Sequence, residues 1–245
     1  MDYNAEILKA DFIVDARTTL PRHATKKWSR RDPSKLKGIV YHQSLDDYGL
    51  AKNNAKYHVG PNHITELGLP GLSYTIFVEK DGMGFLANDI EDVTLSQGYA
   101  GHTGDENVDF LGVCFGGNFS GPGYEGPQCP TGHQMNTAGY LWYHLKEIFG
   151  WSDEDIYGHF DFGKPACPGY DLMKMIERIR PKMFNSTTER QKALVKLGYY
   201  KGDQDGMWGS GCKTALVEFQ RAAGLDPDGV WGKKTTAAVR AAMLG

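Results

Sequence analysis

Short apolar runs along the first three quarters of the chain predict strands. Residues 38–42, 73–79 and 110–115 are rich in β-branched and aromatic side chains, which favour extended structure. Lys80-Asp81-Gly82 follows the second run and leads into another at residues 83–87, so the pattern predicts a β-hairpin there. Together these segments predict a β-sheet.

Apolar residues at helical spacing mark two segments later in the chain. The first covers residues 133–149 and stops at Gly150. The second runs from Tyr170 to about Arg180, where Pro181 ends it. Strands interspersed with helices predict an α/β fold in which helices cover the sheet.

The last part of the chain repeats a short motif and predicts a separate helical unit. Asp205-Gly206-Met207-Trp208-Gly209 recurs 23 residues later as Asp228-Gly229-Val230-Trp231-Gly232. An Asp-Gly pair suits a tight turn, and each Trp supplies a large apolar anchor between helices. Helices are predicted over residues 189–197, 212–222 and 235–243, so this block is a small three-helix bundle.

The composition is that of a folded protein and excludes several classes. A chain of 245 residues that is 40% hydrophobic and 23% charged has room for one to two domains. The net charge of −3 excludes a strongly basic nucleic-acid binder, and no apolar run reaches the ~18 residues of a membrane-spanning helix. Residues 1–6 lack a basic region followed by an apolar stretch, so we expect no secretory signal peptide.

Charge is divided unequally along the chain. Residues 185–245 carry nine Lys and Arg against six Asp and Glu, which gives +3. The remainder carries 18 basic against 24 acidic residues, which gives −6. This difference, with a change in composition near residues 181–188, favours two domains over one.

Two histidines and one cysteine in the larger block form a candidate metal site. His42 ends the first predicted strand, and Cys167 lies eight residues after His159. Two imidazoles and one thiolate, with a fourth position open to water, are what a catalytic zinc ion requires. Such an ion turns its water into a nucleophile at neutral pH and polarises a carbonyl. Spacing alone does not separate this reading from three structural side chains.

The order of the motifs resembles a known enzyme family. The matching segments are Ile39-Val40-Tyr41-His42, residues 71–82, Ala100-Gly101-His102, residues 111–119, Gly158-His159 and Cys167-Pro168-Gly169. From residue 37 to residue 172 they resemble the zinc amidases that phage endolysins share with animal peptidoglycan recognition proteins. The resemblance implies an N-acetylmuramoyl-L-alanine amidase with a mixed central sheet flanked by helices.

The resemblance also implies roles for individual residues. It implies Zn2+ as the cofactor, with His42, His159 and Cys167 as the metal ligands. Tyr74 matches a tyrosine beside the metal-bound water and is the first expected catalytic residue. Lys164 is the second, although the family places its lysine or threonine two residues before the third ligand, where this chain has Pro165.

The C-terminal block resembles the three-helix peptidoglycan-binding domain appended to many cell-wall hydrolases. The matching pattern runs from Gln191 to Thr235, and Cys212 stands in the first repeat where the second has Thr235. The expected substrate contacts are His102, Asn107, Trp208 and Trp231. The expected organisation is an N-terminal arm wrapping the catalytic domain at residues 1–36, a zinc amidase domain at 37–180, a linker at 181–188 and a peptidoglycan-binding domain at 189–245.

We therefore expect a peptidoglycan hydrolase that cleaves the amide bond between N-acetylmuramic acid and L-alanine. A non-catalytic recognition protein and a zinc peptidase cutting within the stem peptide are the alternatives. The expected role is a phage endolysin, present in the host cytoplasm before its release to the cell wall, with a bacterial autolytic amidase as the alternative. We expect bacterial peptidoglycan as the partner, no nucleic acid, no membrane insertion and a monomeric chain.

Overall fold

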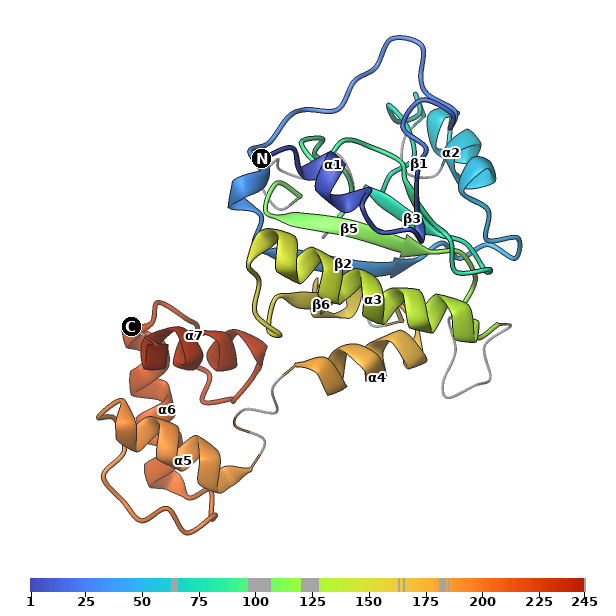
Figure 1. Ribbon diagram of the computed structural model, residues 1–245. Coiled ribbons are helices and arrows are strands. Elements are labelled where there is room, and N and C mark those ends of the chain that lie inside the picture. The colour runs from blue at the N-terminus through green and yellow to red at the C-terminus, as the bar shows by residue number, and fades with distance from the viewer. Residues whose placement is uncertain are drawn as a thin grey trace. The chain divides into compact units, whose positions relative to one another are not determined.

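The chain folds into two compact units, Met1–Pro181 and Lys182–Gly245 (Figure 1). The structure is a computed structural model. It describes residues 1–62, 66–96, 107–119, 128–162, 164, 166–180, 184 and 186–244. Among the described helices, none combines the length and the apolar character needed to cross a bilayer.

The first unit is built on a six-stranded sheet with the strand order β1-β4-β3-β5-β2-β6. The strands are β1 (Ile13–Asp15), β2 (Gly38–Gln43), β3 (Ile76–Val78), β4 (Gly84–Leu86), β5 (Phe110–Phe115) and β6 (Ile156–Gly158). Every neighbouring pair is parallel except the predicted hairpin of β3 and β4. The expectation of a mixed sheet flanked by helices is therefore confirmed.

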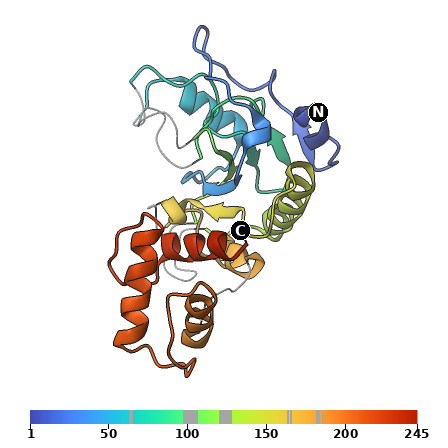
Figure 2. The ribbon, with the colours of Figure 1, turned by 90° about the vertical axis from the view of Figure 1, so that its left-hand side faces the viewer.

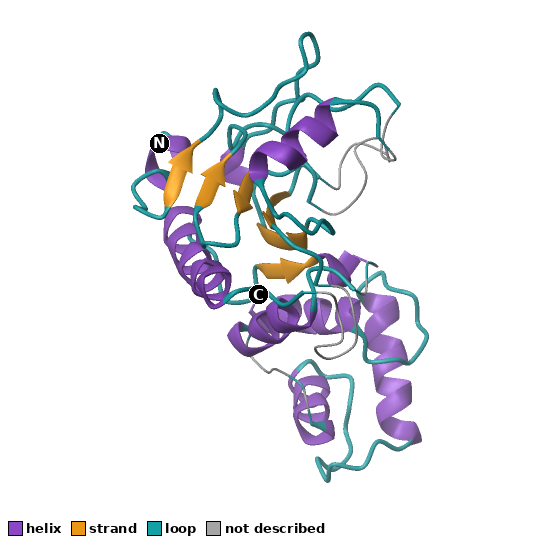
Figure 3. Cartoon of the chain, turned by 90° about the vertical axis from the view of Figure 1, so that its right-hand side faces the viewer, coloured by secondary structure: helices purple, strands orange, loops and turns teal. Residues whose placement is uncertain are grey.

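Helices cover both faces of this sheet (Figures 2 and 3). They are α1 (Tyr3–Ile7), α2 (Ala51–Val59), α3 (Gly132–Phe149) and α4 (Tyr170–Ile179), with short 3-10 helices η1 (Pro33–Lys35) and η2 (His159–Phe162). The main core lies between the sheet and helices α1, α3 and α4. A smaller core lies between the sheet and α2.

Strand alternation decides which side chains of β2 reach the functional face. Successive side chains of a strand point to opposite faces of the sheet. Tyr41 joins the main core, and its hydroxyl donates to the carbonyl of Ala138 in α3 at 2.6 Å. His42 is paired in register with Cys114, which belongs to the core beside α2. His42 therefore points away from α3 and toward the face that α2 covers.

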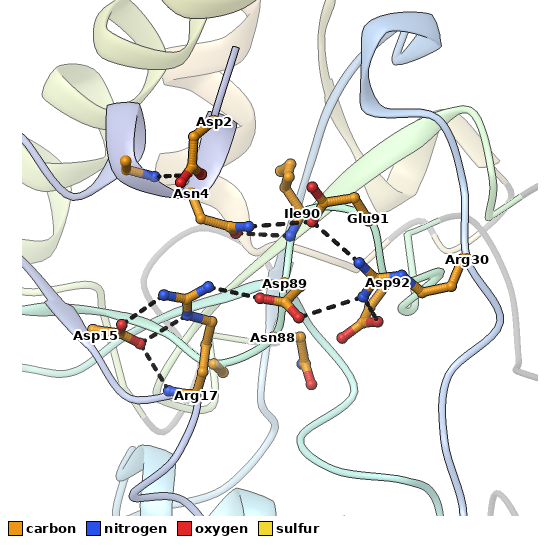
Figure 4. Close-up of polar contacts among 12 residues, drawn as sticks. Asp2, Asn4, Asp15, Arg17, Arg30, Asn88, Asp89, Ile90, Glu91 and Asp92 are labelled. Carbon is orange, nitrogen blue, oxygen red and sulfur yellow. Dashed lines mark hydrogen bonds and ion pairs between the residues drawn. The ribbon is translucent and has the colours of Figure 1, made fainter.

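The N-terminal segment is more regular than the extended arm predicted for residues 1–36. It supplies α1 and the edge strand β1, which pairs with β4. Arg17 and Arg30 both form ion pairs with Asp89, at 2.7 and 3.3 Å (Figure 4). The side-chain oxygen of Asn4 accepts from the backbone of Ile90 at 3.0 Å. These contacts make the segment part of the fold of the first unit.

The described residues of the second unit form the helices α5 (Thr187–Lys196), α6 (Ser210–Ala222) and α7 (Lys233–Leu244), so the predicted small helical domain is confirmed. A buried glutamine completes each Asp-Gly turn. Its amide nitrogen donates to the turn's aspartate at 2.8 Å and to a backbone carbonyl at 3.0 Å, and its oxygen accepts from the glycine at 2.9 Å. The two sets are Gln191 with Asp205, Gly206 and Met207, and Gln220 with Asp228, Gly229 and Val230.

Candidate metal centre

Two neighbouring parallel strands end at the same edge of the sheet, and each brings one histidine there. His42 is the second-to-last residue of β2, and His159 directly follows β6. Tyr41 is paired with Gly158, so the residues that follow them are also neighbours. The two imidazole centroids lie 4.5 Å apart. The fold thus brings together two side chains that are far apart in the sequence.

The loop after His159 folds back and brings Cys167 to the same place. The backbone nitrogen of Phe160 donates to the carbonyl of Cys167 at 2.8 Å. The backbone of Lys164 bonds to both ends of the loop. Its backbone nitrogen donates to the carbonyl of His159 at 3.2 Å, and its carbonyl accepts from the backbone nitrogen of Cys167 at 3.0 Å. The Cys167 Sγ atom lies 3.9 Å from the Nδ1 atom of His42.

The three side chains fit a metal ion. Their ligand atoms all lie within 4.8 Å of one another. Among the described residues, these three side chains form the group of His, Cys, Asp and Glu that could hold a metal ion. Tetrahedral bonds of the lengths usual for zinc put a nitrogen and a sulfur ligand about 3.6 Å apart. The 3.9 Å between His42 and Cys167 is close to that value. His42 is buried and the other two side chains are half-buried, so the group has a side that solvent reaches.

Burial sets the protonation of the candidate ligands. It lowers the pKa of His42 well below the usual value, and His159 acts in the same direction, while a hydrogen bond with the backbone of Ser96 opposes both. The ring is therefore neutral, as a metal ligand must be. Burial also raises the pKa of the Cys167 thiol to about 12, against a contact with the backbone of Gln43 that lowers it. A bound cation is what would make this thiol a thiolate at neutral pH.

Tyr74 lies beside the first ligand. Its ring centroid is 4.9 Å from that of His42 and 6.2 Å from that of His58. Its hydroxyl forms a hydrogen bond with the buried thiol of Cys114. Its backbone carbonyl accepts from the side chain of Asn88 at 2.7 Å. The structure therefore brings the predicted catalytic tyrosine to the metal group.

The structure places Lys164 in the loop that joins His159 to Cys167, with an exposed side chain. Its shifted position in the sequence thus still puts it between two candidate ligands. The backbone of Lys164 helps to close that loop, a role that spacing did not indicate.

Of the two expected substrate contacts in the first unit, Asn107 lies among the described residues. His102 lies outside the described residues. The Oδ1 atom of Asn107 accepts from the nitrogen and the hydroxyl of Ser96 at 2.9 and 3.2 Å. The backbone of Ser96 in turn forms a hydrogen bond with His42, so Asn107 is connected to this candidate ligand through Ser96. Its contact with substrate stays a prediction.

The two tryptophans of the repeat meet inside the second unit. Trp208 and Trp231 pack edge to face with centroids 5.9 Å apart, and both are partly buried against its core. The indole nitrogen of Trp231 donates to the hydroxyl of Thr236 at 3.1 Å, and the guanidinium of Arg190 lies 5.6 Å from its ring. Both side chains therefore serve packing, and their contact with substrate stays a prediction.

Sequence reasoning missed Ser96 and Gln43, which contact the candidate ligands through their backbones. No motif marks Ser96. Gln43 does carry a signal, because a polar side chain that follows a ligand in a strand points to the opposite, buried face. That signal predicts that the Gln43 side chain is buried, but it does not predict its hydrogen bonds to Ala166 and Phe119.

Comparison with known proteins assigns both units. Residues 32–170 match the profile of the N-acetylmuramoyl-L-alanine amidase family, and residues 185–239 match that of a peptidoglycan binding domain. None of the curated proteins compared with the chain matches it.

Solved structures resemble about two thirds of this chain at low sequence identity. Drosophila peptidoglycan recognition protein SD is 15% identical, with 68% of this chain and 93% of that chain covered and a TM-score of 0.52. Human PGRP-IBETAC in complex with glycosamyl muramyl pentapeptide is 16% identical, with 69% and 96% covered and a TM-score of 0.52. The endolysin amidase LysCS from Clostridium intestinale URNW is 20% identical, with 68% and 93% covered and a TM-score of 0.49. The first two show that the fold is shared.

Proposed function

This chain belongs to the N-acetylmuramoyl-L-alanine amidase family and is a peptidoglycan amidase, and on that basis we propose that it uses a zinc ion held by His42, His159 and Cys167. The observation that carries the proposal is the convergence of these three donors at one edge of the sheet. The bond cleaved is the amide between N-acetylmuramic acid and the L-alanine of the stem peptide. When bound, the ion lowers the pKa of its water from 15.7 toward ~7 and polarises the scissile carbonyl.

The residues around the ligands would then stabilise the charge that forms on the carbonyl oxygen. The ring of Tyr74 lies next to that of His42, and we propose that its hydroxyl donates a hydrogen bond to that oxygen. Its contact with Cys114 and the bond from Asn88 to its carbonyl support the ring in this position. Lys164 brings a flexible ammonium into the ligand loop and is the second donor that we propose.

The second unit would hold the enzyme on its substrate. We propose that residues 37–180 form the catalytic domain and residues 189–245 the domain that binds peptidoglycan, the partner that both family matches support. Binding through one domain raises the effective concentration of the other on a repetitive polymer. Contacts of Asn107, His102, Trp208 and Trp231 with the glycan or peptide are part of this proposal.

Product analysis tests the reaction. Purified full chain incubated with peptidoglycan should release intact stem peptides that start at L-alanine, detected by mass spectrometry, with new amino groups and no new reducing sugars. Cys167→Ser should lose this activity, whereas Cys129→Ser, which changes an exposed cysteine, should keep it. New reducing ends would indicate a glycosidase, and shorter peptides would indicate a peptidase that cuts within the stem.

For the cellular role we propose a phage endolysin that stays in the host cytoplasm until the membrane is opened. The pairing of an amidase unit with a wall-binding unit supports this role. Cells that express the chain should lyse only after a membrane-permeabilising agent is added, and cells that express Cys167→Ser should not lyse. Lysis without the agent would contradict retention in the cytoplasm.

A further inference from the structure

A buried glutamine next to the first ligand bridges two segments around the metal group. Gln43 is the last residue of β2 and is 4% exposed. Its amide nitrogen donates to the carbonyl of Ala166 at 2.7 Å, and its amide oxygen accepts from the backbone nitrogen of Phe119. Ala166 directly precedes the ligand Cys167, whose thiol is also in contact with the backbone of Gln43.

These contacts connect the ligand loop to the strand that carries His42. The backbone bonds within the loop join Cys167 to Phe160 and Lys164, and so relate it to His159. Those bonds relate the loop to β2 through β6, which pairs with β2 at Tyr41 and Gly158. The bond from Gln43 to Ala166 is a direct connection, because it fixes the peptide next to Cys167 against the end of that strand.

The bond to Phe119 anchors the glutamine on its other side. Phe119 is 4% exposed and belongs to the main core. A Cβ atom added to Gly169, two residues after Cys167, would lie 2.5 Å from the Cβ atom of Phe119. The segment that follows Cys167 therefore packs directly against the residue that Gln43 holds. The two hydrogen bonds of the Gln43 amide therefore hold the chain on both sides of Cys167, directly at Ala166 and through Phe119 at Gly169.

We propose that Gln43 is a positioning residue, which presets the separation of Cys167 and His42 for the metal ion. The proposal rests on the ligand roles proposed above. Side chains that orient metal ligands typically change metal affinity 10- to 100-fold when they are removed. When Gln43 is replaced, all three ligands remain. The loop that carries Cys167 must then become ordered as the ion binds, and this ordering lowers the affinity for the ion.

A matched pair of variants isolates this effect. Gln43→Met keeps the length of the side chain and removes both hydrogen bonds. Gln134→Met is the control, because Gln134 is also buried and its amide donates to the carbonyl of Gly116 at 2.9 Å, which is neither a candidate ligand nor a residue of the ligand loop. Zinc affinity of the full chain is measured by competition with a chromogenic chelator. We expect Gln43→Met to bind zinc about 10- to 100-fold more weakly, and Gln134→Met to bind it as the wild type does.

A second readout separates positioning from general loss of structure. At saturating zinc, Gln43→Met should recover most of its kcat, because the ion then orders the loop. If Gln43→Met does not fold, Gln43→Glu replaces it, since a carboxylate still accepts from Phe119 but cannot donate to Ala166. The same fall in zinc affinity is expected.

The outcomes distinguish this inference from the proposed function. Wild-type zinc affinity in the Gln43 variant overturns the inference alone. An equal loss in Gln134→Met also overturns it, because the effect is then general. A wild-type chain that binds no zinc, or a Cys167→Ser variant that binds it equally well, overturns the proposed ligand set and this inference with it.

Discussion

The repeated turn of the second unit allows one change to be made twice in nearly the same surroundings. Gln220→Leu removes bonds to Asp228, Gly229, Val230 and, at 3.1 Å, the hydroxyl of Thr235. Each buried hydrogen bond contributes a net ~0.5–1.5 kcal/mol. The amide nitrogen has two hydrogens, so its three contacts amount to two donated bonds, and with the accepted bond Gln220 makes three full bonds. Asp228 and Val230 are exposed and regain water, so we expect a loss near the lower limit for three bonds, about 1.5 kcal/mol. For a domain of this size that lowers the midpoint of thermal unfolding by about 6–12 °C.

Gln191→Leu should lower the free energy of unfolding by less than Gln220→Leu does. Its fourth bond goes to the sulfur of Cys212 at 3.5 Å, and sulfur is a weak acceptor. The difference between the two variants should be that of one shared hydrogen bond, about 0.5 kcal/mol. In a Cys212→Thr background the cost of Gln191→Leu should rise to that of Gln220→Leu. Calorimetry of the full chain measures all four variants. Equal costs in the original background, or an unchanged cost of Gln191→Leu in the Cys212→Thr background, would refute the reasoning.

Three further predictions concern the metal group. Tyr74→Phe should lower kcat by about 10²–10³-fold with KM and zinc content unchanged, as steady-state kinetics and metal analysis would show; unchanged kcat would remove Tyr74 from the reaction. Removal of zinc by a chelator should abolish activity and lower the melting temperature, and added zinc should restore both, whereas activity that survives complete removal would contradict a metal mechanism. In the chelated chain the unfolded state binds a proton at His42 that the native state does not, because burial lowers the pKa of that ring, so stability should fall as pH falls below ~6.5. Urea unfolding between pH 7.5 and 5.5 should show a shallower fall in His42→Gln than in a control with the exposed His133→Gln, and equal slopes would refute it.

Elements with a strong apolar pattern are predictable from the sequence. The run at residues 110–115 is strand β5, and the spacing over residues 133–149 is helix α3, which begins at a capping box of Thr131 and Gln134. The run at residues 73–79 is only partly strand, since β3 covers Ile76–Val78. Thr75 is nevertheless bonded to the carbonyl of Gly112 at 3.0 Å.

Elements that bury small or polar residues escape such reasoning. Helix α2 buries Ala51, Asn54, Ala55 and His58, which form no apolar stripe. Strands β1 and β6 have three residues each, too few to show alternation. The same limit applies to the site. The resemblance indicates His42, His159 and Cys167, but Gln43 and Ser96 reach them through contacts that only the folded chain creates.

The order of the ligands along the chain has a consequence for how the enzyme resists unfolding. His42 and Cys167 are 125 residues apart, so an ion bound between them closes most of the catalytic unit into a single loop. Binding that is restricted to the native state adds stability in proportion to the logarithm of free metal concentration. The metal would thus be a removable crosslink, present where zinc is available and released where it is scarce. The persistence of the enzyme would then depend on the metal content of its surroundings as well as on its substrate.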